Sequence, residues 1–197
     1  EQRLSISRDL HDNIGAQLTF IISSVDNVKY AFDITNEKLD QKLTNISSFA
    51  KETILELRDT IWAMNHNEIS YEDLEIRINN YIEKAKQSKD QISFSFAIED
   101  VLKTKRLTSV EGMNIYRTIQ EAINNAIKYA NASIISVNVK EQDGQTKITI
   151  SDNGSGFDTE TTESGNGLQN MKKRIEEIGG KFVLSSSIEG TKIEVLV

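Results

Sequence analysis

The spacing of apolar residues along the chain changes near residue 65, from a purely helical period to one that also includes the alternation typical of strands. Before that point apolar side chains recur at steps of three and four, which collects them on one side of a helix. The first stripe consists of Leu10, Ile14, Leu18, Ile21, Val25 and Val28, and the second of Leu39, Leu43, Ile46, Phe49 or Ala50, Thr53 or Ile54, Leu57 and Ile61. Turn-forming residue types at positions 33–36 separate the two stripes. The pattern predicts a helical hairpin.

Two helices with one narrow stripe each cannot bury both stripes against each other alone. Pairing two hairpins into a four-helix bundle would cover them. We therefore expect a homodimer that forms through a first domain, residues 1–66.

Beyond a linker at about residues 65–70, apolar residues also alternate with polar ones, as in half-buried strands. The second domain, residues 67–197, is expected to contain helices at about 71–89, 108–130 and 168–178. Strands are expected at about 92–96, 134–140, 147–151, 182–186 and 192–197. The predicted fold class is α+β, with the helical hairpin of a dimeric four-helix bundle followed by an α/β sandwich, one sheet covered by helices.

Charge and composition exclude several functions. A net charge of -7 argues against nucleic acid as the main partner. The absence of cysteine excludes disulfides, thiol catalysis and cysteine-ligated metals. No apolar run is long enough to span a membrane, so we expect no membrane contact within this fragment. Because the sequence opens inside a helical pattern, we expect any sensor or anchor to lie upstream.

Polar residues at helical spacing mark the segment 108–130 as a candidate binding surface. Glu121, Asn124, Asn125 and Lys128 fall on one side of this helix. An ordinary solvated helix face has a similar pattern. Asparagine, however, is a poor helix former, so two of them in mid-helix need a role such as presenting amide oxygens to a metal or phosphate.

Two glycine-rich loops follow this helix. The first, Asp152-Asn-Gly-Ser-Gly-Phe-Asp158, ends a predicted strand, and its glycines permit close backbone approach to a ligand. Asp-Asn-Gly is also a common turn signal. The second, Gly165-Asn-Gly-Leu168, opens a helix whose free N–H groups can bind phosphate oxygens. The polar stretch between them is typical of a lid.

Together these pieces resemble the GHKL-type ATP-binding domain shared by histidine kinases, Hsp90-type chaperones, type II topoisomerases and MutL proteins, over residues 108–197. The resemblance implies ATP and Mg²⁺ as ligands, with Asn125 holding the metal. It implies that Asp152 reads the adenine amino group and that Thr191 closes the adenine site. The other pocket residues that it implies are Glu121, Asn124, Lys128, Tyr129, Gly154, Gly156, Gly165, Gly167 and Leu168.

The N-terminal domain resembles one subfamily of histidine kinases. Arg8-Asp-Leu-His-Asp-Asn-Ile-Gly15 is similar to its phosphoacceptor box, and Arg58-Asp-Thr-Ile-Trp-Ala-Met-Asn65 to the end of its second hairpin helix. The resemblance implies autophosphorylation on His11, with Asp12 orienting or deprotonating the imidazole. It implies transfer to a response regulator of the NarL/LuxR or LytTR type that docks near His11. The chain would be the cytoplasmic portion of a larger membrane-anchored or multidomain sensor.

The sequence departs from that subfamily at two positions. Many relatives carry a glutamine five residues after the histidine, where this chain has Ala16, with Gln17 next to it. The resemblance therefore does not extend to phosphatase activity. His66 stands where relatives have a proline.

Two other functions remain open. One is a non-catalytic dimeric scaffold that binds ATP as a conformational switch, although a scaffold has no need of the pair His11 and Asp12. The other is a GHKL-type ATPase, in which Glu121 would activate a water molecule.

Overall fold

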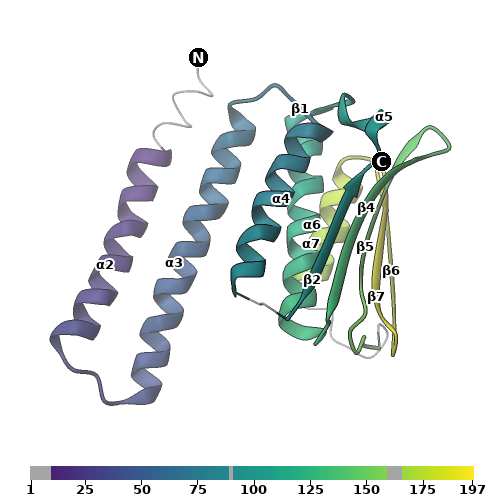
Figure 1. Ribbon diagram of the computed structural model, residues 1–197. Helices are drawn as coiled ribbons and strands as arrows, with labels where there is room; N and C mark the ends of the chain where they lie inside the picture. Colours follow the sequence, from purple (N-terminus) through teal and green to yellow (C-terminus); the bar gives the residue numbers. More distant parts are fainter. Residues whose placement is uncertain (1–9, 89–90, 159–165) are drawn as a thin grey trace. The chain divides into compact units, whose positions relative to one another are not determined.

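The chain divides into two compact units, residues 1–67 and residues 68–197. We analysed a computed structural model, which describes residues 10–88, 91–158 and 166–197 (Figure 1). In the described part of the chain, no helix combines the length and apolar character needed to cross a bilayer.

The first unit is a helical hairpin. A π-helical turn, η1 (Leu10–Ile14), leads into α2 (Gly15–Ala31), and α3 (Glu37–Met64) forms the second arm. The predicted long first helix is thus confirmed from Gly15 onward, whereas the π-helical turn was not predicted. Gly15 stands where the two meet, and glycine weakens a regular helix at that point.

The connection between the arms follows the turn chemistry of its residues. Asp33 adopts a positive φ of 44°, and the Asn36 side chain accepts a hydrogen bond from the Leu39 backbone N–H, which caps α3. Across the hairpin, the Lys29 ammonium contacts Asp40 at 2.8 Å and Thr44 at 2.8 Å. These contacts fix the tip of the hairpin.

The hairpin leaves much of its apolar surface in solvent. Val25 and Ala50 are buried, but Phe20 is 73% exposed and Phe49 is 71% exposed. Five residues of the predicted stripes are 38–49% exposed, namely Ile14, Ile21, Val28, Leu39 and Ile46. Within the described residues, one hairpin alone therefore does not bury its stripes.

The second unit is an α/β sandwich, which confirms the predicted fold class. Its sheet has the order β2-β4-β5-β7-β6, and only the β2–β4 pair is parallel. The strands are β2 (Ser93–Ile98), β4 (Ile134–Gln142), β5 (Gln145–Asp152), β6 (Lys181–Ser187) and β7 (Gly190–Leu196). Helices α4 (Tyr71–Ser88), α6 (Ser109–Tyr129) and α7 (Asn166–Glu177) cover one face (Figure 1).

Three short elements were not predicted. Strands β1 (Glu68–Ser70) and β3 (Arg106–Thr108) pair with each other in a separate small sheet, and α5 (Asp100–Lys103) lies between β2 and β3. Elements of three or four residues are too short to display a period, so the spacing of apolar residues cannot reveal them.

A capping box opens α6. The Thr108 hydroxyl accepts from the Glu111 backbone N–H at 3.2 Å, and the Glu111 carboxylate accepts from the Thr108 backbone N–H at 2.7 Å. Because α6 carries much of the core, including Ile119 and Ile123, this cap stabilises the helix at the centre of the unit.

We expect Thr108→Ala to lower the melting temperature of this unit by roughly 2–4 °C, because losing an N-cap side chain costs about 1 kcal/mol. Thermal unfolding followed by circular dichroism would measure the shift. Thr104→Ala, at an exposed threonine just after α5, serves as the control. Equal shifts in both variants would contradict a capping role for Thr108.

Candidate functional site

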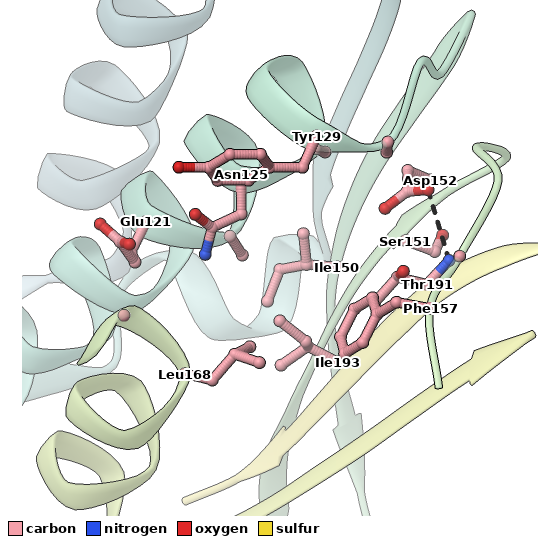
Figure 2. A pocket seen from close by; sticks show the side chains of 15 residues that line it. Glu121, Asn125, Tyr129, Ile150, Ser151, Asp152, Phe157, Leu168, Thr191 and Ile193 are labelled. Atoms are coloured by element: carbon pink, nitrogen blue, oxygen red, sulfur yellow. Dashed lines mark hydrogen bonds between the residues drawn. The ribbon is translucent and has the colours of Figure 1, made fainter. Parts of the chain in front are cut away.

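A cavity of about 540 Å³ lies in the second unit, between α6, strands β5 and β7, and the start of α7 (Figure 2). This volume is typical of a site for a small-molecule ligand. The lining residues are Glu121, Ala122, Asn125, Ala126, Tyr129, Ala130, Ile150, Ser151, Asp152, Gly156, Phe157, Gly167, Leu168, Thr191 and Ile193.

The structure brings most of the sequence-predicted pocket residues together around this cavity. Those that line it are Glu121, Asn125, Tyr129, Asp152, Gly156, Gly167, Leu168 and Thr191. Asn124 and Lys128 do not line it: Asn124 is half-buried at the side of α6, and Lys128 is exposed.

The remaining predicted residues lie elsewhere. Gly154 does not line the cavity; it is buried, and an added Cβ there would overlap the Ala130 carbonyl oxygen. Gly165 lies outside the described residues. His11 and Asp12 belong to the first unit, in the η1 turn.

Helix α6 presents two rows of side chains to the cavity. Glu121, Asn125 and Tyr129 form a polar row at steps of four, and Ala122, Ala126 and Ala130 form a row of small side chains beside it. The alanine row was not predicted to line a pocket, since alanine on an apolar helix face is indistinguishable from ordinary core. The repeat of a small residue every fourth position, where the neighbouring core positions hold isoleucine, is the signal that could have revealed it.

The opposite wall is apolar. Ile150 on β5 and Ile193 on β7 are register partners that are 4% and 5% exposed, and Phe157 and Leu168 complete the surface (Figure 2). Ile150, Phe157 and Ile193 were not predicted to line a pocket, because nothing in the sequence separates an apolar side chain beside a ligand from one in a core. Such a wall suits a flat, weakly polar ring.

Asp152 supplies the carboxylate of the cavity at the end of β5. One of its oxygens, Oδ1, accepts hydrogen bonds from the backbone N–H groups of Gly154 at 2.8 Å and Thr191 at 3.3 Å. Figure 2 shows the bond from Thr191. These bonds fix the carboxylate and leave the second oxygen as an acceptor for a ligand. An amino group in the plane of a ring is a suitable donor to it.

At two positions that line the cavity, neighbouring atoms come so close to the backbone that only glycine fits. Gly156 has a φ of +60°, and a Cβ there would overlap the Ser187 carbonyl oxygen. A Cβ at Gly167, in the first turn of α7, would overlap Oε1 of Glu121. The first turn of α7 therefore lies directly against α6, and its free backbone N–H groups border the polar row.

The charged residues here do not form a metal site by themselves. Within the described ranges, no group of three or more His, Cys, Asp or Glu side chains is positioned to hold a metal ion. Asn125 and Glu121 offer one amide and one carboxylate side by side. A cation at this point would need further oxygens from the ligand itself.

Two family models match the chain. Residues 111–197 match the family described as histidine kinase-, DNA gyrase B- and HSP90-like ATPases, and residues 2–68 match the family described as histidine kinase. The first match implies an ATP-binding domain, and its range contains every residue that lines the cavity.

Curated relatives cover both units. The sensor histidine kinase YxjM of Bacillus subtilis is 30% identical over 99% of this chain and 47% of its own length. The sensor protein VraS of Staphylococcus aureus is 27% identical over 99% of this chain and 55% of its own length. The chain thus spans about half the length of these relatives.

Solved structures share the fold. The histidine kinase domain of a blue-light activated histidine kinase from Erythrobacter litoralis is similar with a TM-score of 0.60 and 14% identity, over 92% of this chain and 94% of that chain. The histidine kinase AdeS of Acinetobacter baumannii has a TM-score of 0.59 and 16% identity, over 95% of this chain and 96% of that chain. At these identities the likeness concerns the fold alone.

Proposed function

The chain belongs to the histidine kinase family of two-component systems, and on that premise we propose that it phosphorylates its own His11 with ATP and passes the phosphoryl group to an aspartate of a response regulator. One observation carries the proposal. A unit with the His11-Asp12 pair and a unit with a nucleotide-sized cavity occur in a single chain. Residues 1–66 would dimerise and accept the phosphoryl group, and residues 67–197 would bind ATP.

The adenine ring of ATP would lie in the apolar part of the cavity. The free oxygen of Asp152 would accept from its exocyclic amine, and Thr191 lies beside that carboxylate. Ile150 and Ile193 would cover one face of the ring. The phosphates would then extend toward the first turn of α7, whose N–H groups attract negative charge.

Mg²⁺ would be held by the Asn125 amide oxygen together with phosphate oxygens, and the Glu121 carboxylate is the second protein oxygen within the polar row. These oxygen donors fit a hard cation that takes one or two protein ligands and completes its shell with phosphate and water. When bound, the cation offsets negative charge on the transferring phosphoryl group. Lys128 does not line the cavity, so any positive charge that it offers the phosphates would act from the exposed surface of α6.

His11 would act as the nucleophile. One imidazole nitrogen of the neutral ring forms a bond to the γ-phosphorus as the bond from phosphorus to the bridging oxygen breaks and ADP leaves. Asp12, the next residue, would orient the ring or take the proton from its other nitrogen. A response-regulator aspartate then takes the phosphoryl group, and His11 is regenerated.

The first unit would supply both partner surfaces. Its exposed stripe residues favour a homodimer in which two hairpins bury them in a four-helix bundle. The regulator, of the NarL/LuxR or LytTR type, would dock on the hairpin near His11, where Gln17 is exposed and bonds to Asn13 at 3.2 Å. Since the curated relatives are about twice as long, we propose that the chain is the cytoplasmic portion of a larger membrane-anchored or multidomain sensor.

Incubation with γ-labelled ATP and Mg²⁺ tests the proposal. We expect label on the protein that is lost in acid and retained in alkali, as for a phosphorus–nitrogen bond. An ATPase that uses Glu121 to activate water would instead release phosphate continuously without labelling the protein. A scaffold that binds ATP as a switch would give nucleotide binding and neither product, and either result would contradict the kinase assignment.

A further inference from the structure

Ser186 joins three parts of the cavity wall through its hydroxyl, although it does not line the cavity. It lies on β6, opposite Thr191 on β7 in the register of the sheet. Its Oγ accepts a hydrogen bond from the Phe157 backbone N–H at 3.0 Å and lies 2.9 Å from Oγ1 of Thr191. A longer contact of 3.5 Å leads to the Gly190 carbonyl oxygen.

The number of hydrogens that the Ser186 and Thr191 hydroxyl groups can donate decides which of the two is the donor in their contact. A serine hydroxyl has one hydrogen to donate, and the Phe157 N–H already occupies one acceptor direction of Oγ. If Thr191 donated to Ser186, the Ser186 hydrogen would be left with the Gly190 carbonyl at 3.5 Å, a distance at the limit for a hydrogen bond. If Ser186 donates to Thr191, both short contacts are used. The favoured chain of donation therefore runs from Phe157 through Ser186 to Thr191.

This direction determines what Thr191 offers to a ligand. Its Oγ1 accepts from Ser186, so its own hydrogen is free to point into the cavity that Thr191 lines. Next to it, the free oxygen of Asp152 is an acceptor, because Oδ1 is held by backbone N–H groups. The cavity then presents one acceptor and one donor side by side (Figure 2).

An acceptor beside a donor is complementary to the hydrogen-bonding edge of adenine but not to that of guanine. Adenine has an amino group that donates and a neighbouring ring nitrogen, N1, that accepts. Guanine has an oxygen and an N1–H in the same places, which reverses both roles. A freely rotating threonine hydroxyl would serve either N1, directly or through one water molecule, whereas a threonine that is held as a donor serves adenine alone.

We propose that Ser186 is a positioning residue that holds the Thr191 hydroxyl as a donor toward N1 of the base and so contributes to the choice of adenine. The inference rests on the proposed binding of ATP in this cavity. It adds a residue outside the cavity that acts on the base only through Thr191.

The test compares ATP with 1-deaza-ATP, in which carbon replaces N1. Dissociation constants would be measured by isothermal titration calorimetry on the whole chain. We expect the wild type to bind ATP about tenfold more tightly than 1-deaza-ATP, the ratio that one hydrogen bond of about 1.4 kcal/mol gives. In Ser186→Ala we expect ATP to bind about fivefold more weakly, while the affinity for 1-deaza-ATP changes less than twofold.

Ser185→Ala is the matched control, since Ser185 precedes Ser186 on β6, is exposed, and donates to the Lys192 carbonyl oxygen at 3.4 Å. It should retain the wild-type ratio. If Ser186→Ala weakened the binding of ATP and of 1-deaza-ATP equally, the inference would be overturned, because a general effect on folding or cavity shape weakens both nucleotides alike. If Ser186→Ala bound ATP and kept the wild-type ratio of the two dissociation constants, the inference would be overturned as well. A wild type that binds neither nucleotide would overturn the proposed function together with the inference.

Discussion

Replacing His11 with glutamine is expected to abolish labelling of the protein by γ-labelled ATP. Glutamine is polar and of similar size, but its amide nitrogen is not a nucleophile, so no phosphorus–nitrogen bond can form. ATP affinity should stay within about twofold of wild type, since the cavity is built entirely from residues of the second unit. Labelling and nucleotide binding would be measured on the same preparations.

His66→Gln is the matched control, because the chain contains only two histidines. His66 follows α3, where its Nδ1 lies 2.7 Å from the Trp62 carbonyl oxygen and its ring lies 5.0 Å from the Trp62 ring. We expect His66→Gln to remain labelled. Persistent label in His11→Gln, or loss of label only in His66→Gln, would refute His11 as the acceptor.

Gly156→Ala is expected to weaken ATP binding by about a hundredfold or more. A positive φ of 60° costs an alanine roughly 1–2 kcal/mol, and its Cβ would also overlap the Ser187 carbonyl oxygen. Relief of that overlap must move the loop that carries Phe157, and with it part of the cavity wall. Titration with ATP would measure the loss.

Gly144→Ala separates the two causes. Gly144 lies in the turn between β4 and β5, has a φ of +79°, and has no heavy atom within 4 Å of an added Cβ. We expect it to lose about 1 kcal/mol of stability and to bind ATP within about twofold of wild type. If Gly144→Ala weakened ATP binding as much as Gly156→Ala, backbone strain alone would explain both, and the close approach at Gly156 would not matter.

The fold was largely predictable because its elements are long enough to show a period. The two helical stripes, the α6 capping box and the alternating strands each carry a local physical signal. The short strands β1 and β3 escaped because their pairing joins segments that are far apart in sequence. The η1 turn escaped because its residues do not differ in pattern from those of an α-helix.

The cavity was predictable only in its polar part. Asp152, Asn125 and Thr191 belong to recognisable motifs, so their convergence on one cavity could be expected. Ile150 and Ile193 could not, because burial beside a ligand and burial in a core select the same side chain. The placement of Asn124 and Lys128 away from the cavity depends on the rotation of α6 against the sheet, which spacing along one helix does not determine.

The short connection between the units has a kinetic consequence. Only residues 65–67 separate the end of α3 from the start of β1, and β1 is tied to its own unit by pairing with β3. Three residues span at most about 10 Å. Such a tether keeps donor and acceptor at a high effective concentration, in the millimolar range typical of short linkers. Within an intact hairpin dimer, the rate of the proposed phosphoryl transfer per chain should therefore be independent of protein concentration.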